Sequence, residues 1–265
     1  MQDIKQAYVS PHLKFFKEKL MKRWGFREYD NINEPAFFFG TRSTDSLEKI
    51  QNHQGFKLLL AGGPEDMPNW NYLTNRKNLF VAIPEGPGFF SPVEGVTFKY
   101  MLPELKDLSM FKPNVLGDKI YFYSGWDGLV LPPYLNILQK KIDYEIITTP
   151  HSSKPTCVNE VISLYYSEEY LKETYYDKTF LNIQVRETGG MQTVRELGLM
   201  GRPTLMNTPW YSNFKGLLHY DNMEDAINII NKEAKKIGTI QPEIQSHTMI
   251  TDEWLHTKYW TSNII

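Results

Sequence analysis

Residues 180–207 (FLNIQVRETGGMQTVRELGLMGRPTLMN) have the types and spacing of a phosphate-binding segment. A buried strand is predicted to end at Val185, and Gly189 and Gly190 follow it. A helix is then predicted to begin near the second glycine and to end at Gly201. Backbone N–H groups in the first turn of a helix attract anions, and glycines leave room for a close approach. This order of strand, glycines and helix therefore favours binding of a diphosphate group.

Two polar side chains of the predicted helix face the same way, because residues three positions apart lie on one helix face. The hydroxyl of Thr193 can donate to a phosphate oxygen, and Glu196, facing an open cleft, can accept hydrogen bonds from a ribose diol. Met191, Val194 and Leu197 form the face predicted to pack on the sheet, and Met191 also lies in the predicted ligand-binding turn. The alternative interpretation is an ordinary strand–helix junction with a solvated glutamate.

The stretch TGGMQTVRELGLMGRP resembles the nucleotide-sugar site of GT-B-fold, retaining glycosyltransferases of the "group 1" type. It is most similar to the short versions found in marine microbes and large DNA viruses. The resemblance implies that Glu196 binds the nucleotide ribose and that Thr193 contributes a hydroxyl on the phosphate side. It also implies that Gly189, Gly190 and the following helix N-terminus hold the diphosphate.

Other positions carry the remaining roles that the resemblance implies. Glu187 is the candidate for contacting the donor sugar, although the usual spacing from the ribose-binding glutamate falls one residue later. The loop YSGWDGL supplies Gly125 as a candidate contact but no Lys or Arg, so Arg186 is the substitute cation for the diphosphate. A surface salt bridge is the alternative role for Arg186. Asp66, in the loop after LLLAG, is the candidate catalytic base.

The elements that must position these residues alternate between short apolar runs and helical patterns, which is typical of α/β proteins. Strands are expected at 36–40, 56–61, 79–83, 118–125, 144–149, 180–185, 203–207 and 216–220. Helices are expected at 44–54, 134–141, 159–176, 190–201, 222–238 and 251–260, the first of them capped by Ser43 or Thr44 and the fifth by Asn222. The pattern restarts after a linker around 111–119, which indicates two domains.

We therefore expect an α/β protein with two Rossmann-like domains facing across a cleft, as in the GT-B fold, with an abbreviated N-terminal domain. Residues 1–112 would form the acceptor-side domain and 113–250 the nucleotide-sugar-binding domain. Residues 251–265 would form a C-terminal helix that packs back on the first domain.

Composition limits the possible partners and cofactors. The 29 basic and 31 acidic side chains nearly cancel, so no general field attracts nucleic acid or anionic membranes. No Asp-x-Asp occurs and the six histidines are scattered, so neither a metal nor another cofactor is expected. The single Cys157 excludes an internal disulfide, and no segment approaches the ~20 apolar residues of a membrane span. These features predict a soluble, cytoplasmic protein.

The expected activity is metal-independent transfer of a sugar from a nucleoside diphosphate sugar to a hydroxyl of a glycan, lipid or protein. The resemblance implies retention of configuration at the anomeric carbon. Two alternatives remain open at this point. One is a nucleotide-sugar 2-epimerase of the same fold, and the other is a non-catalytic protein that binds a nucleotide or a sugar.

Overall fold

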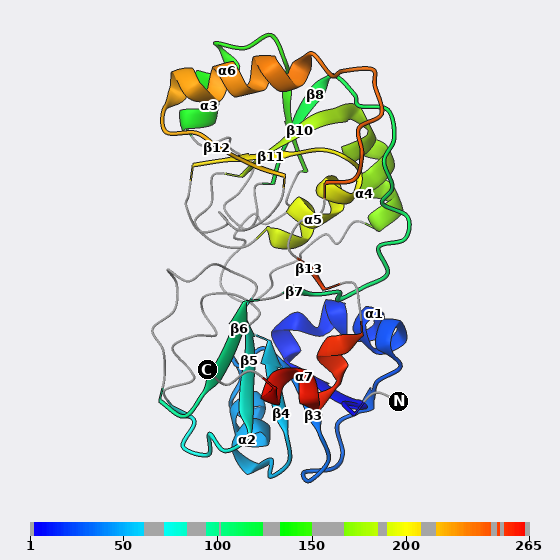
Figure 1. The fold of residues 1–265 in the computed structure, drawn as a ribbon, viewed down its shortest axis with the longest axis vertical. Helices are drawn as coiled ribbons and strands as arrows, with labels where there is room; N and C mark the ends of the chain where they lie inside the picture. The colour runs from blue at the N-terminus through cyan, green and yellow to red at the C-terminus, as the bar shows by residue number, and fades with distance from the viewer. Residues whose placement is uncertain are drawn as a thin grey trace, which may run out of the picture. The chain divides into compact units, whose positions relative to one another are not determined.

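The chain forms two compact units in the computed structural model, drawn in Figure 1. Unit 1 combines Met1–Leu108 with His247–Ile265, and unit 2 is the continuous stretch Ser109–Ser246. The sequence placed the corresponding boundaries at 112/113 and 250/251. The structure describes residues 3–60, 72–83, 94–100, 102–123, 133–149, 167–184, 190–207, 216–244, 248–249 and 252–262.

Unit 1 is built on six parallel strands in the order β2-β1-β3-β4-β5-β6. The strands are β1 (Gln6–Val9), β2 (Arg27–Glu28), β3 (Ala36–Phe39), β4 (Lys57–Leu60), β5 (Leu79–Ile83) and β6 (Thr97–Tyr100). The other elements are η1 (Pro11–Leu13), α1 (Lys14–Trp24), α2 (Thr44–Asn52), η6 (Glu253–Leu255), α7 (Thr257–Thr261) and a two-stranded parallel pair of β7 (Leu102–Pro103) with β13 (Thr248–Met249). The sequence had indicated only β3, β4 and β5 of the main sheet.

Successive residues of the central strands enter two different cores, as the alternation of side chains along a strand requires. Phe37 and Phe39 of β3 pack with α1 and the C-terminal segment, and Phe38 between them packs with Ile50 of α2. Ser43 caps α2 by accepting a hydrogen bond from the backbone N–H of Ser46, which confirms the predicted start of this helix. Unit 1 is therefore a sheet covered on both faces (Figure 1).

The C-terminal segment belongs to the core of unit 1. Trp254 and Trp260 are both fully buried, and the Trp254 ring meets that of Phe37 edge to face. The backbone N–H of Asp3 donates to the carbonyl oxygen of Leu255 at 3.1 Å. Both ends of the described chain are thus fixed in the same unit.

Unit 2 is built on five parallel strands in the order β12-β11-β10-β8-β9. The strands are β8 (Lys119–Phe122), β9 (Ile146–Thr148), β10 (Thr179–Gln184), β11 (Thr204–Met206) and β12 (Leu217–His219). The helices are α3 (Pro133–Gln139), α4 (Glu168–Thr174), η4 (Tyr176–Lys178), α5 (Met191–Leu199) and α6 (Met223–Ala234). The side chain of Asn222 caps α6, as predicted. The α/β class and both parallel sheets are therefore established.

The two faces of the second sheet differ in chemistry. One face is apolar, where Ile120, Ile183 and Leu205 pack with α3 and α6. The opposite face carries buried polar side chains, including Asn182 and Thr204, which are joined by a hydrogen bond of 3.1 Å. Figure 1 shows α3 and α6 on one side of this sheet and α4 and α5 on the other. The polar face is the one that bears on the predicted site.

Every helix in the described ranges is too short or too polar to cross a lipid bilayer.

Candidate functional site

The strand order of unit 2 reverses between β8 and β10. The chain runs from β8 outward to β9 on one side, then returns to β10 on the other side and continues to β11 and β12. In open parallel sheets, ligands bind outside the carboxyl ends of the strands at such a reversal. The residues at this point are Tyr123, directly after β8, and Gln184, the last residue of β10. This edge is therefore the expected ligand-binding place of unit 2.

Gly190 joins these two side chains at the start of α5. It caps the helix with a left-handed backbone, φ 79° and ψ 3°. A Cβ atom at this position would lie 2.6 Å from Nε2 of Gln184 and 3.0 Å from Cδ1 of Tyr123. Both the backbone conformation and the available space thus require glycine. The first turn of α5 consequently begins at the reversal point, against residues from both flanking strands.

Thr193 and Glu196 of α5 both bond to the side chain of Tyr176. The Tyr176 hydroxyl donates to Oε2 of Glu196 at 2.9 Å and also forms a hydrogen bond with the side chain of Thr193. The two residues therefore share one helix face, as their spacing predicted. However, Thr193 is 7% exposed and Glu196 is 2% exposed. The open, cleft-facing position expected for Glu196 is not observed.

Tyr176 lies in a group of buried aromatic residues. Its ring centroid is 5.2 Å from that of Tyr121, whose hydroxyl in turn bonds to Oγ1 of Thr149 at 2.5 Å. Burial raises the pKa of Tyr176 well above its ordinary value, and the neighbouring charge of Glu196 raises it further. Burial likewise raises the pKa of Tyr121. Both hydroxyls therefore remain protonated and can act as donors near neutral pH.

The other end of α5 is held by a buried arginine. The guanidinium of Arg202 donates to the backbone carbonyls of four residues: Tyr176, Thr179, Met200 and Val115. Burial lowers the pKa of Arg202 to about 10, which still leaves it charged at neutral pH. Gly201, immediately before it, has φ 82°, the left-handed conformation suited to a helix end. The GLMGR part of the motif therefore ends the helix and fixes it to the preceding strand.

The structure brings together only some of the residues that the sequence singled out. Gly190, Thr193 and Glu196 lie on one short segment, and Met191 is the first residue of α5. The predicted catalytic and binding residues Asp66, Gly125, Arg186, Glu187 and Gly189 lie outside the described residues.

Three residues at this edge were missed by the sequence interpretation: Tyr123, Gln184 and Tyr176. A polar residue at the end of an otherwise buried strand is a usable signal, and Gln184 in LNIQ provides it. No comparable signal exists for Tyr123 or Tyr176, because their neighbours come from other strands and helices.

Within the described ranges, no three His, Cys, Asp or Glu side chains gather in a way that could hold a metal ion.

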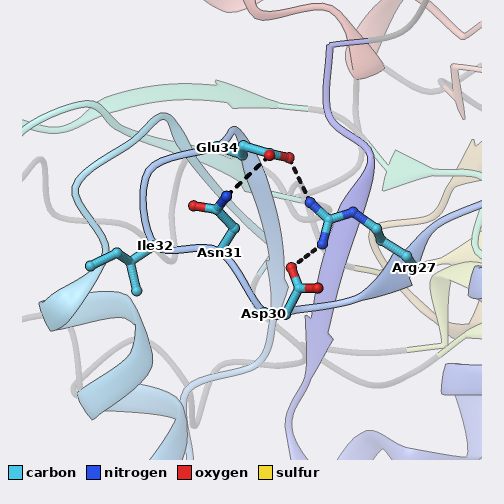
Figure 2. A pocket seen from close by; sticks show the side chains of 5 residues that line it. All are labelled: Arg27, Asp30, Asn31, Ile32 and Glu34. Carbon is cyan, nitrogen blue, oxygen red and sulfur yellow. Dashed lines mark hydrogen bonds and ion pairs between the residues drawn. The ribbon is translucent and has the colours of Figure 1, made fainter.

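A separate surface hollow lies on unit 1, at the connection from β2 to β3 (Figure 2). Its lining residues are Arg27, Asp30, Asn31, Ile32 and Glu34. The guanidinium of Arg27 pairs with the carboxylates of both Asp30 and Glu34. Because this cation is already neutralised by two acids, the hollow is poorly suited to a phosphate. It also precedes the amino end of β3, whereas ligands bind at carboxyl ends.

No protein-family model matches the sequence, and no curated protein is significantly similar to it. The fold and the site define the class: an α/β protein with two parallel sheets, whose second sheet presents a helix N-terminus at its strand-order reversal.

Proposed function

We propose that this protein is a glycosyltransferase of the GT-B type that moves a sugar from a nucleoside diphosphate sugar to a hydroxyl acceptor without a metal. Unit 2 binds the nucleoside diphosphate, and the acceptor is a glycan, lipid or protein hydroxyl. The observation that carries the proposal is the position of α5, which starts at Gly190 beside the carboxyl ends of β8 and β10.

Each part of the donor then has a place along the segment. The diphosphate lies at the first turn of α5, where Gly189 and Gly190 allow its approach and backbone N–H groups donate to it. Arg186 supplies a positive charge, and Glu196 accepts hydrogen bonds from the ribose. Stabilising the departing diphosphate with fixed donors lowers the barrier to transfer, so positioning accounts for most of the catalysis. Asp66 and Glu187 are the proposed catalytic residues.

Nucleotide binding is the first test. Thermal unfolding is followed with UDP, GDP, ADP and CMP, each also as its sugar derivative. A ligand at ~100 times its dissociation constant stabilises the folded protein by ~2.7 kcal/mol, which raises the melting temperature measurably. One nucleotide family is expected to stabilise the protein in the presence of EDTA. The absence of any shift refutes nucleotide binding, and a shift that needs manganese refutes metal independence.

Turnover is the second test and separates the proposal from its alternatives. The stabilising donor is supplied with a labelled sugar, and the products are followed over time. Transfer or slow hydrolysis is expected for a glycosyltransferase. Conversion into an epimeric nucleotide sugar indicates a 2-epimerase instead, and tight binding without any product indicates a binding protein.

A further inference from the structure

Tyr176 is fixed in the structure at both of its ends. Its backbone carbonyl oxygen accepts a hydrogen bond from Nε of Arg202 at 3.0 Å, and its ring packs edge-on against that of Tyr121. The residue is 1% exposed. Its hydroxyl is therefore held at a defined point, and that point is 2.9 Å from Oε2 of Glu196.

This fixed hydroxyl has a direct effect on the glutamate. A free glutamate side chain samples several rotamers, and holding it in one of them costs free energy each time a ligand binds. A hydrogen bond from a rigid donor imposes that rotamer in advance. A carboxylate has about four acceptor positions on its two oxygens, so the tyrosine and a ribose hydroxyl can bond to it together.

We propose that Tyr176 is a positioning residue that fixes the Glu196 carboxylate for recognition of the nucleotide's ribose hydroxyls. The inference rests on the proposed function, because it takes the ligand to be a ribonucleotide. It goes beyond that function by naming the part of the ligand that Tyr176 controls. Tyr176 acts through Glu196 and does not itself contact the nucleotide.

The test is the ratio of two dissociation constants, measured by calorimetry. The probes are the nucleotide from UDP, GDP, ADP and CMP that binds most tightly, and its 2′,3′-dideoxy analogue. The native protein is expected to bind the dideoxy analogue about ten- to a hundredfold more weakly, as for hydrogen bonds to a charged group. Tyr176→Phe is expected to weaken binding of the ribonucleotide about three- to tenfold and that of the dideoxy analogue less than twofold.

Tyr121→Phe is the matched control. It removes a buried tyrosine hydroxyl from the same aromatic group, but one that bonds to Thr149 and not to Glu196. The ratio of the two dissociation constants is expected to stay at its native value in this variant. A purely structural role for Tyr176 would weaken both ligands equally and leave the ratio unchanged, which overturns the inference.

Glu196→Gln provides a second measurement that holds even if Tyr176→Phe does not fold. The ratio is expected to fall at least as far in this variant as in Tyr176→Phe, and combining both changes is expected to lower it no further. A native ratio in Glu196→Gln overturns the inference. The two levels fail differently: a native protein that binds no nucleotide refutes the proposed function, whereas nucleotide binding without ribose discrimination refutes only this inference.

Discussion

Replacing Gly190 by alanine tests the geometry of the α5 N-terminus, and Gly238 provides a matched comparison in the same unit. Both glycines have φ 79°. A Cβ at Gly190 would meet Gln184 and Tyr123, whereas a Cβ at Gly238 has no atom within 4 Å. The two substitutions therefore share the backbone strain but differ in crowding.

The expected magnitudes follow from these two contributions. Alanine in the left-handed conformation costs ~1–2 kcal/mol, and both variants are expected to lose that much free energy of unfolding. Forcing an extra carbon into a packed interior costs a further ~1–3 kcal/mol, which applies only at Gly190. Gly190→Ala is thus expected to lose about 2–5 kcal/mol and Gly238→Ala about 1–2 kcal/mol.

Urea unfolding with linear extrapolation measures both values. Nucleotide binding, measured in parallel, is expected to weaken in Gly190→Ala and to remain native in Gly238→Ala. Equal losses of stability in the two variants would show that Gln184 and Tyr123 do not crowd the helix start, and the reasoning about this edge would be refuted.

Three further substitutions give independent tests. Glu196→Gln is expected to reduce the free energy of unfolding by about 1–3 kcal/mol, because a buried acceptor of the Tyr176 hydroxyl loses its charge; an unchanged urea midpoint contradicts this. Arg202→Lys is expected to cost about 2–4 kcal/mol, since a compact ammonium cannot reach the carbonyls that the guanidinium spans; thermal unfolding measures it. Burial lowers the pKa of Lys57 to about 8, so the folded protein releases this proton at a lower pH than the unfolded chain. Stability is therefore expected to rise from about pH 8 to about pH 10, and Lys57→Met is expected to lack that rise in urea titrations.

The strands and helices with strong local signals could be predicted from the sequence. The strand at Leu79–Ile83 begins and ends at the predicted residues, because an apolar run bounded by polar residues defines it. The capping residues Ser43 and Asn222 also marked the starts of their helices. In contrast, β1 and β6 were missed. β6 (TFKY) alternates polar and apolar residues weakly, and β1 (QAYV) is short and contains a buried glutamine.

The site was only partly predictable, for a physical reason. Spacing within one helix is a local property, so the shared face of Thr193 and Glu196 could be predicted from their separation. Burial depends on what packs against that face, and the residue that does so, Tyr176, lies 20 positions away. The sequence pattern of a solvated and of a buried glutamate is the same here. The predicted open position of Glu196 failed for this reason.

The composition of unit 1 from two distant stretches sets the order in which the chain can fold during synthesis. Translation proceeds from the N-terminus, and domains generally fold as they emerge from the ribosome. Unit 2 is continuous, so all of its residues are available before Trp254 and Trp260 have been made. Until these two indoles arrive, the rings of Trp24 and Phe37 lack partners that the finished core provides. The first unit to begin synthesis is therefore the last that can be completed, and a nascent chain halted before residue 254 exposes an aromatic surface that a chaperone can bind.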